Sequence, residues 1–161
     1  GAGAFMGYWG APEATAKVLR PDPLWRYAGV PAPNVVFTGD LGWKTAEGLL
    51  VIKGRRDRQI KSMGVRVSPD EIETMIRATG LVRDVAIVGV PHEIMGEMIV
   101  AAVITPADAP DPVSALKAFV RKEMSQHMQP RVWHPMESFP LTPNGKTDFI
   151  RLRKDLSQGA V

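Results

Sequence analysis

Residues 54–69 read GRRDRQIKSMGVRVSP, and this stretch decides how the second half of the chain is expected to fold. Gly54 and Gly64 bound a basic run, and glycine lets the backbone turn in ways that other residues avoid. Residues 59–67 predict a β-hairpin with its turn at 62–64. A new domain is therefore expected to begin near residues 54–57.

A strongly marked helix start follows the hairpin. Ser68 is the expected N-cap, and Pro69 suits the first helical position. Asp70 and Glu71 place negative charge in the first turn, where the helix dipole favours it. Because Glu71 stands three residues after Ser68, the two side chains predict a capping box. The helix is expected to end at Gly80.

The remaining apolar segments predict a small sheet covered by helices. The runs at 85–90 and 98–105 are almost continuously apolar, which indicates strands covered on both faces, and 91–97 reads as a loop. Further expected elements are a helix from Asp111, a strand around residues 131–133, and a last amphipathic helix that buries Phe149, Ile150, Leu152 and Leu156. The order predicts an α+β domain that opens with a β-hairpin.

The first third of the chain reads as short elements and loops. Residues 12–19 resemble a helix, and four prolines between positions 21 and 33 predict a loop. Short strands are expected at 34–37 and 49–53, with a turn at 44–48.

Composition limits the classes of partner and site. The formal charge is +3 with a pI near 9.4, which is compatible with nucleotides, CoA or nucleic acid as anionic partners. There is no cysteine, and the three histidines lack the paired spacing of a zinc motif, so no metal site is expected. The apolar runs are too short for a membrane span and the N-terminus does not read as a signal peptide, so we expect a cytoplasmic location.

Two further motifs carry chemistry beside the basic hairpin. Thr38-Gly39-Asp40 places a carboxylate after an apolar strand, where it can accept hydrogen bonds from a ribose diol. Residues 141–146 read LTPNGK, a turn that projects Lys146. Taken singly, each has an ordinary explanation: Asp40 as a turn residue, the basic run as surface charge, and Lys146 as an exposed lysine.

In this order and spacing, the three motifs resemble the C-terminal third of the AMP-forming adenylating enzymes. This superfamily holds acyl-CoA synthetases, carrier-protein adenylation domains and luciferases. The resemblance implies that residues 1–56 are a remnant of the end of a large N-terminal domain with its linker, and that residues 57–161 are a mobile C-terminal domain. The family's phosphate-binding loop, adenine pocket and acyl pocket lie in sequence absent here, so we expect a fragment that is inactive alone.

The resemblance also assigns roles to single residues. In the family, the aspartate that matches Asp40 binds the ribose hydroxyls of ATP and AMP, and Arg55 matches a residue with a ribose or phosphate contact. Asp57 matches the hinge about which the C-terminal domain rotates between two reaction states. Gly64, with Arg66 beside it, matches the channel that admits pantetheine in CoA-forming relatives.

Lys146 matches the lysine of the family's catalytic loop. The resemblance implies that it reaches both the carboxylate and the α-phosphate, and a cation there offsets the repulsion between two anions. The implied cofactor is ATP or AMP with Mg²⁺, bound mainly by the absent N-terminal domain, and CoA is the implied co-substrate.

The leading hypothesis is therefore an AMP-forming acyl-CoA ligase whose partners are its own N-terminal domain, a carboxylic acid and CoA. Loading of a phosphopantetheinyl carrier protein is a second possibility that the C-terminal sequence does not decide against. A third hypothesis, from another class, is a stand-alone basic binding module. The basic hairpin lacks interleaved aromatic residues for base stacking, so we expect no nucleic-acid partner.

Overall fold

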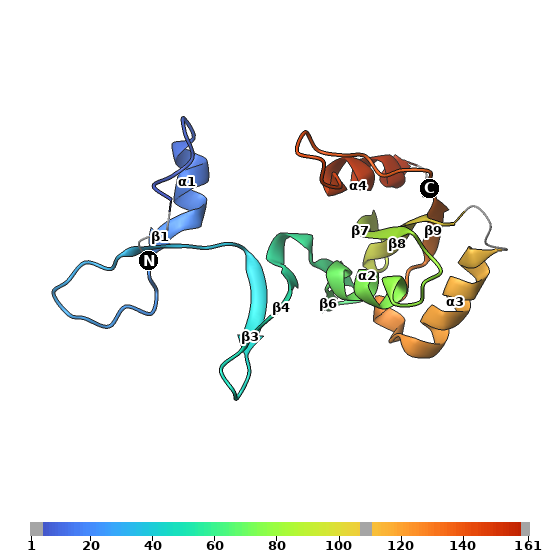
Figure 1. The fold of residues 1–161 in the computed structure, drawn as a ribbon, viewed down its shortest axis with the longest axis horizontal. Helices are drawn as coiled ribbons and strands as arrows, with labels where there is room; N and C mark the ends of the chain where they lie inside the picture. The colour runs from blue at the N-terminus through green and yellow to red at the C-terminus, as the bar shows by residue number, and fades with distance from the viewer. Residues whose placement is uncertain (1–4, 107–110, 159–161) are drawn as a thin grey trace. The chain divides into compact units, whose positions relative to one another are not determined.

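The computed structural model describes residues 5–106 and 111–158. The chain forms two compact units, Gly1–Asp40 and Leu41–Val161. The expected domain boundary at 56/57 concerns the family's mobile domain and stays a prediction. Figure 1 labels the main elements of both units.

The N-terminal unit is built from short elements. They are α1 (Pro12–Val18), β1 (Leu19–Pro21) and β2 (Asn34–Val36). β1 and β2 pair antiparallel, and the Asp22 amide donates to the Pro33 carbonyl at 2.9 Å, which closes the proline-rich loop between them. The guanidinium of Arg20 lies 3.8 Å from the centre of the Phe37 ring. None of the described residues 5–40 is buried, so local hydrogen bonds and surface contacts hold this unit.

The C-terminal unit contains the remaining elements; Asp40, the first residue of β3, is assigned to the N-terminal unit. They are β3 (Asp40–Lys44), β4 (Leu50–Arg55), η1 (Arg56–Arg58), β5 (Ile60–Ser62), β6 (Val65–Val67), α2 (Pro69–Arg77), β7 (Asp84–His92), β8 (Gly96–Ile104), α3 (Pro112–Glu123), η2 (Gln126–Met128), β9 (Val132–Pro135) and α4 (Phe149–Gln158). The main sheet runs β6-β5-β8-β7, and β9 lies parallel to β8. The predicted α+β domain with an opening hairpin is confirmed.

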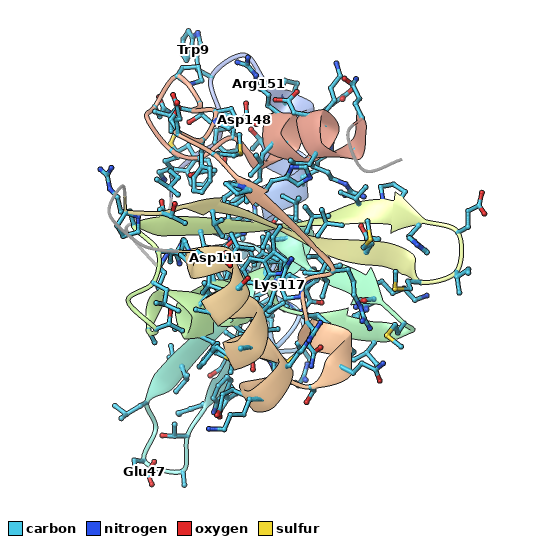
Figure 2. All side chains as sticks on the ribbon, turned by 90° about the vertical axis from the view of Figure 1, so that its right-hand side faces the viewer. Trp9, Glu47, Asp111, Lys117, Asp148 and Arg151 are labelled. Carbon is cyan, nitrogen blue, oxygen red and sulfur yellow. The ribbon has the colours of Figure 1, made fainter. Side chains whose placement is uncertain are left out.

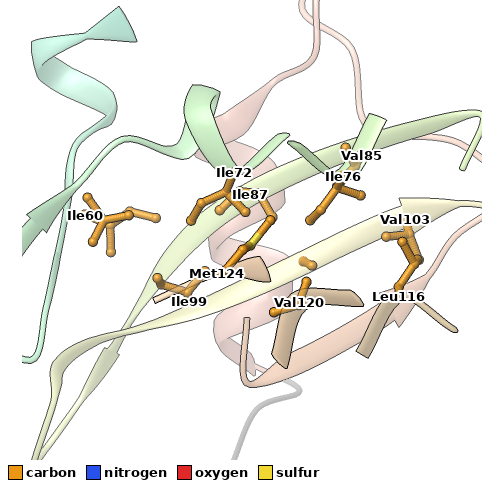
Figure 3. Packing of buried hydrophobic residues seen from close by; sticks show 12 residues of the cluster. Ile60, Ile72, Ile76, Val85, Ile87, Ile99, Val103, Leu116, Val120 and Met124 are labelled. Atoms are coloured by element: carbon orange, nitrogen blue, oxygen red, sulfur yellow. The ribbon is translucent and has the colours of Figure 1, made fainter. Parts of the chain in front are cut away.

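Both faces of the sheet are buried, as the continuous apolar runs predict. On one face, α2 and α3 pack through Ile72, Ile76, Leu116 and Val120 onto the strands (Figure 3). On the other face, α4 packs through Leu152 and Leu156, together with Phe139. Figure 2 shows α3 and α4 on opposite sides of the strands.

The β7–β8 hairpin is longer than the sequence predicts. The predicted loop at 91–97 is wrong, because Pro91 pairs with Glu97 and His92 pairs with Gly96 within nine-residue strands. Pro91 is tolerated because β7 is an edge strand of the described sheet, where a missing backbone N–H leaves no gap in a central ladder.

The start of α2 differs from the predicted capping box. Ser68 occupies the N-cap position, but its hydroxyl donates to the Lys53 carbonyl at 3.2 Å and bonds no helix N–H. The Glu71 carboxylate lies 3.5 Å from the Lys53 ammonium. The capping-box prediction is therefore wrong, because β4 packs against this end of the helix and supplies competing partners.

The helices α3 and α4 follow their predictions with one exception. Asp111 caps α3, and its carboxylate accepts from the Ser114 amide at 3.2 Å. In α4, Leu152 and Leu156 are buried, whereas Ile150 is 86% exposed. The prediction that Ile150 lies on the buried face is wrong, because the face of α4 that packs on the sheet runs through Phe149, Leu152 and Leu156 at spacings of three and four.

Candidate functional site

An open cleft of about 890 Å³ lies within the C-terminal unit. It is bordered by η1, the start of α2, the middle of β7, the loop before α4, and α4 itself. Among its lining residues are Arg55, Asp57, Arg58, Lys146 and Phe149. Three predicted site residues, Arg55, Asp57 and Lys146, therefore share one cleft.

Arg55 and Asp57 form a two-bond ion pair in the η1 turn. Arg55 Nε donates to Asp57 Oδ1 at 3.0 Å, and Arg55 Nη2 donates to Asp57 Oδ2 at 3.1 Å. The hydrogen bond from Arg55 lowers the pKa of the Asp57 carboxyl below its ordinary value of 3.8. The predicted nucleotide-binding residue and the predicted hinge residue are thus joined to each other, which the sequence did not indicate.

Gly54 allows the η1 turn to lie against α2. Its φ is 145°, in the region that favours glycine, and a Cβ there would collide with the Asp70 carboxylate and stand 2.9 Å from Ser68 Oγ. The same Asp70 carboxylate accepts from the Arg55 amide at 3.3 Å. Gly54 therefore lets backbone and carboxylate approach closely.

Arg58 is the most enclosed cation of the cleft, with 17% of its side chain exposed. It pairs with Asp70, and its Nη2 lies 2.5 Å from Glu73 Oε1. Its guanidinium also lies 3.7 Å from the centre of the Phe149 ring. The sequence presented Arg58 only as one charge in a basic run.

Glu73 is a buried carboxylate that sequence reasoning missed. Only 4% of its side chain is exposed, and Oε1 accepts from the Ile87 amide at 2.9 Å as well as from Arg58. A signal was present, because Glu73 stands three residues before the buried Ile76 and so shares the apolar face of α2. A charged residue at a core position indicates a buried partner.

A tight loop carries the exposed Lys146. The Thr142 amide donates to the Lys146 carbonyl at 2.7 Å, and the Lys146 amide donates back to Thr142 Oγ1 at 3.2 Å. Gly145 has a φ of 74°, which this turn requires. Asp148 then caps α4 by accepting from the Arg151 amide at 3.0 Å (both labelled in Figure 2). The loop that carries Lys146 is therefore fixed at both ends.

Gly64 and Arg66 lie on the β5–β6 hairpin and not among the residues lining the cleft. Met63 and Gly64 have φ values of 52° and 80°, the pattern of a two-residue type I′ turn. A Cβ on Gly64 would meet open space. The turn is tied to the β7–β8 hairpin, because the Met63 amide donates to the Met95 carbonyl at 3.0 Å.

Asp40 is the last residue of the N-terminal unit and is exposed. Its amide donates to Thr38 Oγ1 at 3.2 Å, and Gly39 before it has a φ of 82°. This geometry places the carboxylate directly after a turn, as the Thr38-Gly39-Asp40 motif predicts.

With this geometry in view, the chain was compared with known proteins. Residues 71–146 match the model of a family described as the AMP-binding enzyme C-terminal domain. The matched segment lies entirely within the C-terminal unit. The expected resemblance to adenylate-forming enzymes is thereby confirmed.

Relatives of this AMP-binding C-terminal domain include peptide synthases and acyl-CoA synthetases. The dimodular nonribosomal peptide synthase of Bacillus subtilis is 32% identical over 92% of the chain, which spans 6% of that protein. ATP-bound MatB from Rhodopseudomonas palustris is 27% identical, with a TM-score of 0.82 over all of this chain and 30% of its own. A Mycobacterium tuberculosis fatty acyl CoA synthetase is 29% identical, with a TM-score of 0.64 over 96% of this chain and 28% of its own.

The described residues contain neither a cluster of metal-ligating side chains nor a helix that could span a membrane. Across residues 5–106 and 111–158, no three His, Asp or Glu side chains gather where they could hold a metal ion. In the same residues, no helix has the length and apolar character needed to cross a bilayer.

Proposed function

We propose that the chain is the C-terminal part of an AMP-forming ligase that activates a carboxylic acid and passes the acyl group to CoA. In the first half-reaction, a carboxylate oxygen attacks the α-phosphorus of ATP, and the bond to pyrophosphate breaks. In the second, the CoA sulfur attacks the acyl carbon, loses its proton and displaces AMP. The observation that carries this proposal is Lys146, which lines a cleft shared with Arg55 in a domain of this family.

Lys146 serves the first half-reaction in this proposal. Two anions must approach each other, and the Lys146 ammonium offsets their repulsion as charge moves onto the leaving pyrophosphate. The fixed loop supports this role, because its hydrogen bonds hold the Lys146 backbone in place at the cleft. Loss of such a contact commonly costs about 3 kcal/mol of transition-state stabilisation.

Arg55 and Asp40 contact the ribose and phosphates of the nucleotide in this proposal. Arg55 donates to Asp57 through two nitrogens, and its guanidinium lines the same cleft as Lys146. Asp40 follows a glycine turn and offers a carboxylate to the ribose diol. When ATP is bound with Mg²⁺, the metal neutralises phosphate charge, and we assign its ligands to sequence outside this chain.

The second half-reaction uses the other predicted residues. We place the hinge at Asp57, the exposed middle residue of the η1 turn, because a hinge needs only a few residues to absorb a rotation. Gly64 and Arg66 then line the route of pantetheine, and the open space at Gly64 supports this assignment.

A second candidate acceptor is a carrier protein bearing phosphopantetheine. Similarity to a nonribosomal peptide synthase favours it, while similarity to a fatty acyl CoA synthetase favours CoA. The basic binding module receives less support, because Arg55 and Arg58 of the basic run are paired with carboxylates. A titration with an oligonucleotide at low and moderate salt tests it, since phosphate binding requires a steep salt dependence.

The proposal is tested on the full-length protein that contains this chain. We expect acid-dependent exchange of labelled pyrophosphate into ATP, and loss of about 100-fold or more in Lys146→Ala. Lys146→Ala should still transfer the acyl group from supplied acyl-adenylate, because the two half-reactions use different domain positions. Equal loss in both steps with normal folding would make Lys146 structural. Parallel assays with CoA and with a phosphopantetheinylated carrier protein decide the acceptor.

The 161-residue chain alone should catalyse no such exchange, because it lacks the family's phosphate-binding loop. Reproducible exchange by the purified chain would overturn the assignment of residues 1–56 as a remnant.

A further inference from the structure

Arg58 is fixed by groups from two elements that border the cleft. Asp70 and Glu73 of α2 accept from its guanidinium, and the Ile87 carbonyl of β7 lies 3.4 Å from Nη2. Glu73 is itself held by the Ile87 amide and by Arg77, whose Nη2 lies 3.5 Å from Oε2. The Arg58 side chain is therefore held in one position, because each of its two terminal nitrogens donates to a carboxylate.

Phe149 connects this fixed guanidinium to the catalytic loop. It is the first residue of α4, three residues after Lys146, and its ring centre lies 3.7 Å from Arg58 Cζ. The guanidinium is largely desolvated, and a cation over an aromatic face is attracted more strongly when water is excluded. The stack thus ties the end of the Lys146 loop to the η1 turn, which ends at Arg58.

We propose that Arg58 is a positioning residue for Lys146, and that it acts through its stack on Phe149. This inference rests on the proposed function, because it assumes that Lys146 takes part in adenylation. Leu152 and Leu156 anchor α4 to the sheet independently of the stack. Loss of the stack therefore loosens the approach of the Lys146 loop to the cleft while the helix stays in place.

The first test is kinetic and uses the full-length protein. Arg58→Lys keeps the charge but loses the planar stack, and Phe149→Leu keeps an apolar side chain but loses the aromatic face. Each should lower kcat of adenylate formation about tenfold with KM for ATP within about twofold, since a small misplacement acts on the transition state. The double variant should be no slower than the slower single variant, because both changes remove the same link.

Two further variants separate positioning from general stability. Arg77→Lys perturbs the same Glu73 carboxylate from a residue outside the Arg58–Phe149 stack, and should keep kcat near wild type. Phe149→Tyr retains the aromatic face and should restore most of the activity that Phe149→Leu loses. The inference is overturned if Arg58→Lys and Arg77→Lys slow the enzyme alike, if the single effects multiply, or if KM rises in place of the fall in kcat.

The second test measures the link without catalysis. Hydrogen exchange of the Thr142, Gly145 and Lys146 amides reports opening of the loop, because each donates within it. Arg58→Lys should speed this exchange several-fold, and Arg77→Lys should leave it unchanged. If the wild-type enzyme forms no adenylate, the proposed function fails. Hydrogen exchange still shows whether Arg58 holds the Lys146 loop through Phe149. Unchanged exchange in Arg58→Lys would overturn the proposed link between Arg58 and the Lys146 loop.

Discussion

Different forces stabilise residues 5–59 and the described residues that follow them. None of the described residues 5–59 is buried, and the first buried side chain along the chain is Ile60. From there on, two apolar clusters fill both faces of one sheet. In the earlier region, large apolar side chains such as Trp9 and Met6 remain at the surface.

The difference shows where the chain changes from local contacts to a core. The η1 turn Arg56–Arg58 ends two residues before Ile60, so the predicted hinge lies at the edge of the packed region. Asp57 itself is held by its half-exposed ion pair with Arg55, which is easier to rearrange than a packed core. A hinge at this place could move without exposing apolar surface.

The largest expected effect tests the contrast between the buried core and the exposed early region. Ile72→Ala in the core should lower the free energy of unfolding by about 4 kcal/mol, because its side chain is fully buried between α2 and the sheet. Trp9→Ala, which removes a larger but fully exposed side chain, should change it by less than about 0.5 kcal/mol. Urea unfolding of the 161-residue chain measures both. A comparable loss in Trp9→Ala would mean that the early region has a core after all.

The second prediction concerns an exposed turn inside the packed region. In the full-length protein, Gly64→Leu should reduce thioester formation by about 100-fold while adenylate formation stays within several-fold, because a bulky side chain obstructs the proposed acceptor route. Single-turnover assays of the two half-reactions measure this.

The control for Gly64→Leu must account for backbone strain. Gly80 has a φ of 69° and also faces open space, so Gly80→Leu carries a similar strain at the end of α2. If Gly80→Leu and Gly64→Leu lower the melting temperature and both half-reactions alike, Gly64 is only a turn former, and its assignment to the acceptor route is withdrawn. Asp57→Pro should also spare adenylate formation and slow thioester formation, because it fixes φ at the predicted hinge.

The third prediction concerns Gly54, which lies shortly before the packed region begins. Gly54→Ala should destabilise the chain by about 2 kcal/mol, because a methyl group meets the Asp70 carboxylate and the backbone has a positive φ. Gly10→Ala is the matched control, with a φ of 64° and open space around it, and should cost about 1 kcal/mol. Equal losses in urea unfolding would show that the contact with Asp70 contributes nothing.

The smallest expected effect is the pH dependence of the η1 turn. The hydrogen bond from Arg55 lowers the folded-state pKa of Asp57. Its contribution to stability is therefore present above the unfolded pKa near 4 and is lost as pH falls through the lower folded value. Asp57→Asn should reduce stability slightly at pH 7 and should flatten the loss of stability below pH about 4. Melting curves from pH 7 to 3 measure this, and an unchanged acid profile would contradict it.

The sequence predicted the elements better than their long-range partners. Runs of β-branched residues and the Ser68-Pro69 helix start are local signals, and the corresponding elements are all present. The capping box failed because Lys53, fifteen residues earlier, captures the Ser68 hydroxyl. A local pattern does not show which distant group competes for a donor.

The same limit applies to the candidate site. The motifs led to Arg55, Asp57 and Lys146, which line one cleft. Nothing in the sequence joined Arg58 to Phe149, which stands 91 positions later and meets it only through the packing of α4 on the sheet. Glu73 could have been noticed from its place on the apolar face of α2, and Arg77, four residues later, could have been predicted as its partner. The contact with Arg58 could not, because it depends on how β7 and α2 pack.

Arg55 and Arg58 should respond differently to ionic strength. The Arg55–Asp57 pair is half exposed, so dissolved ions screen it, whereas the Arg58–Glu73 pair lies beneath the surface, where screening is weak. Raising salt should therefore loosen the outer pair while the inner pair stays closed. The turn would then gain freedom at Arg55 without releasing the guanidinium that supports Phe149.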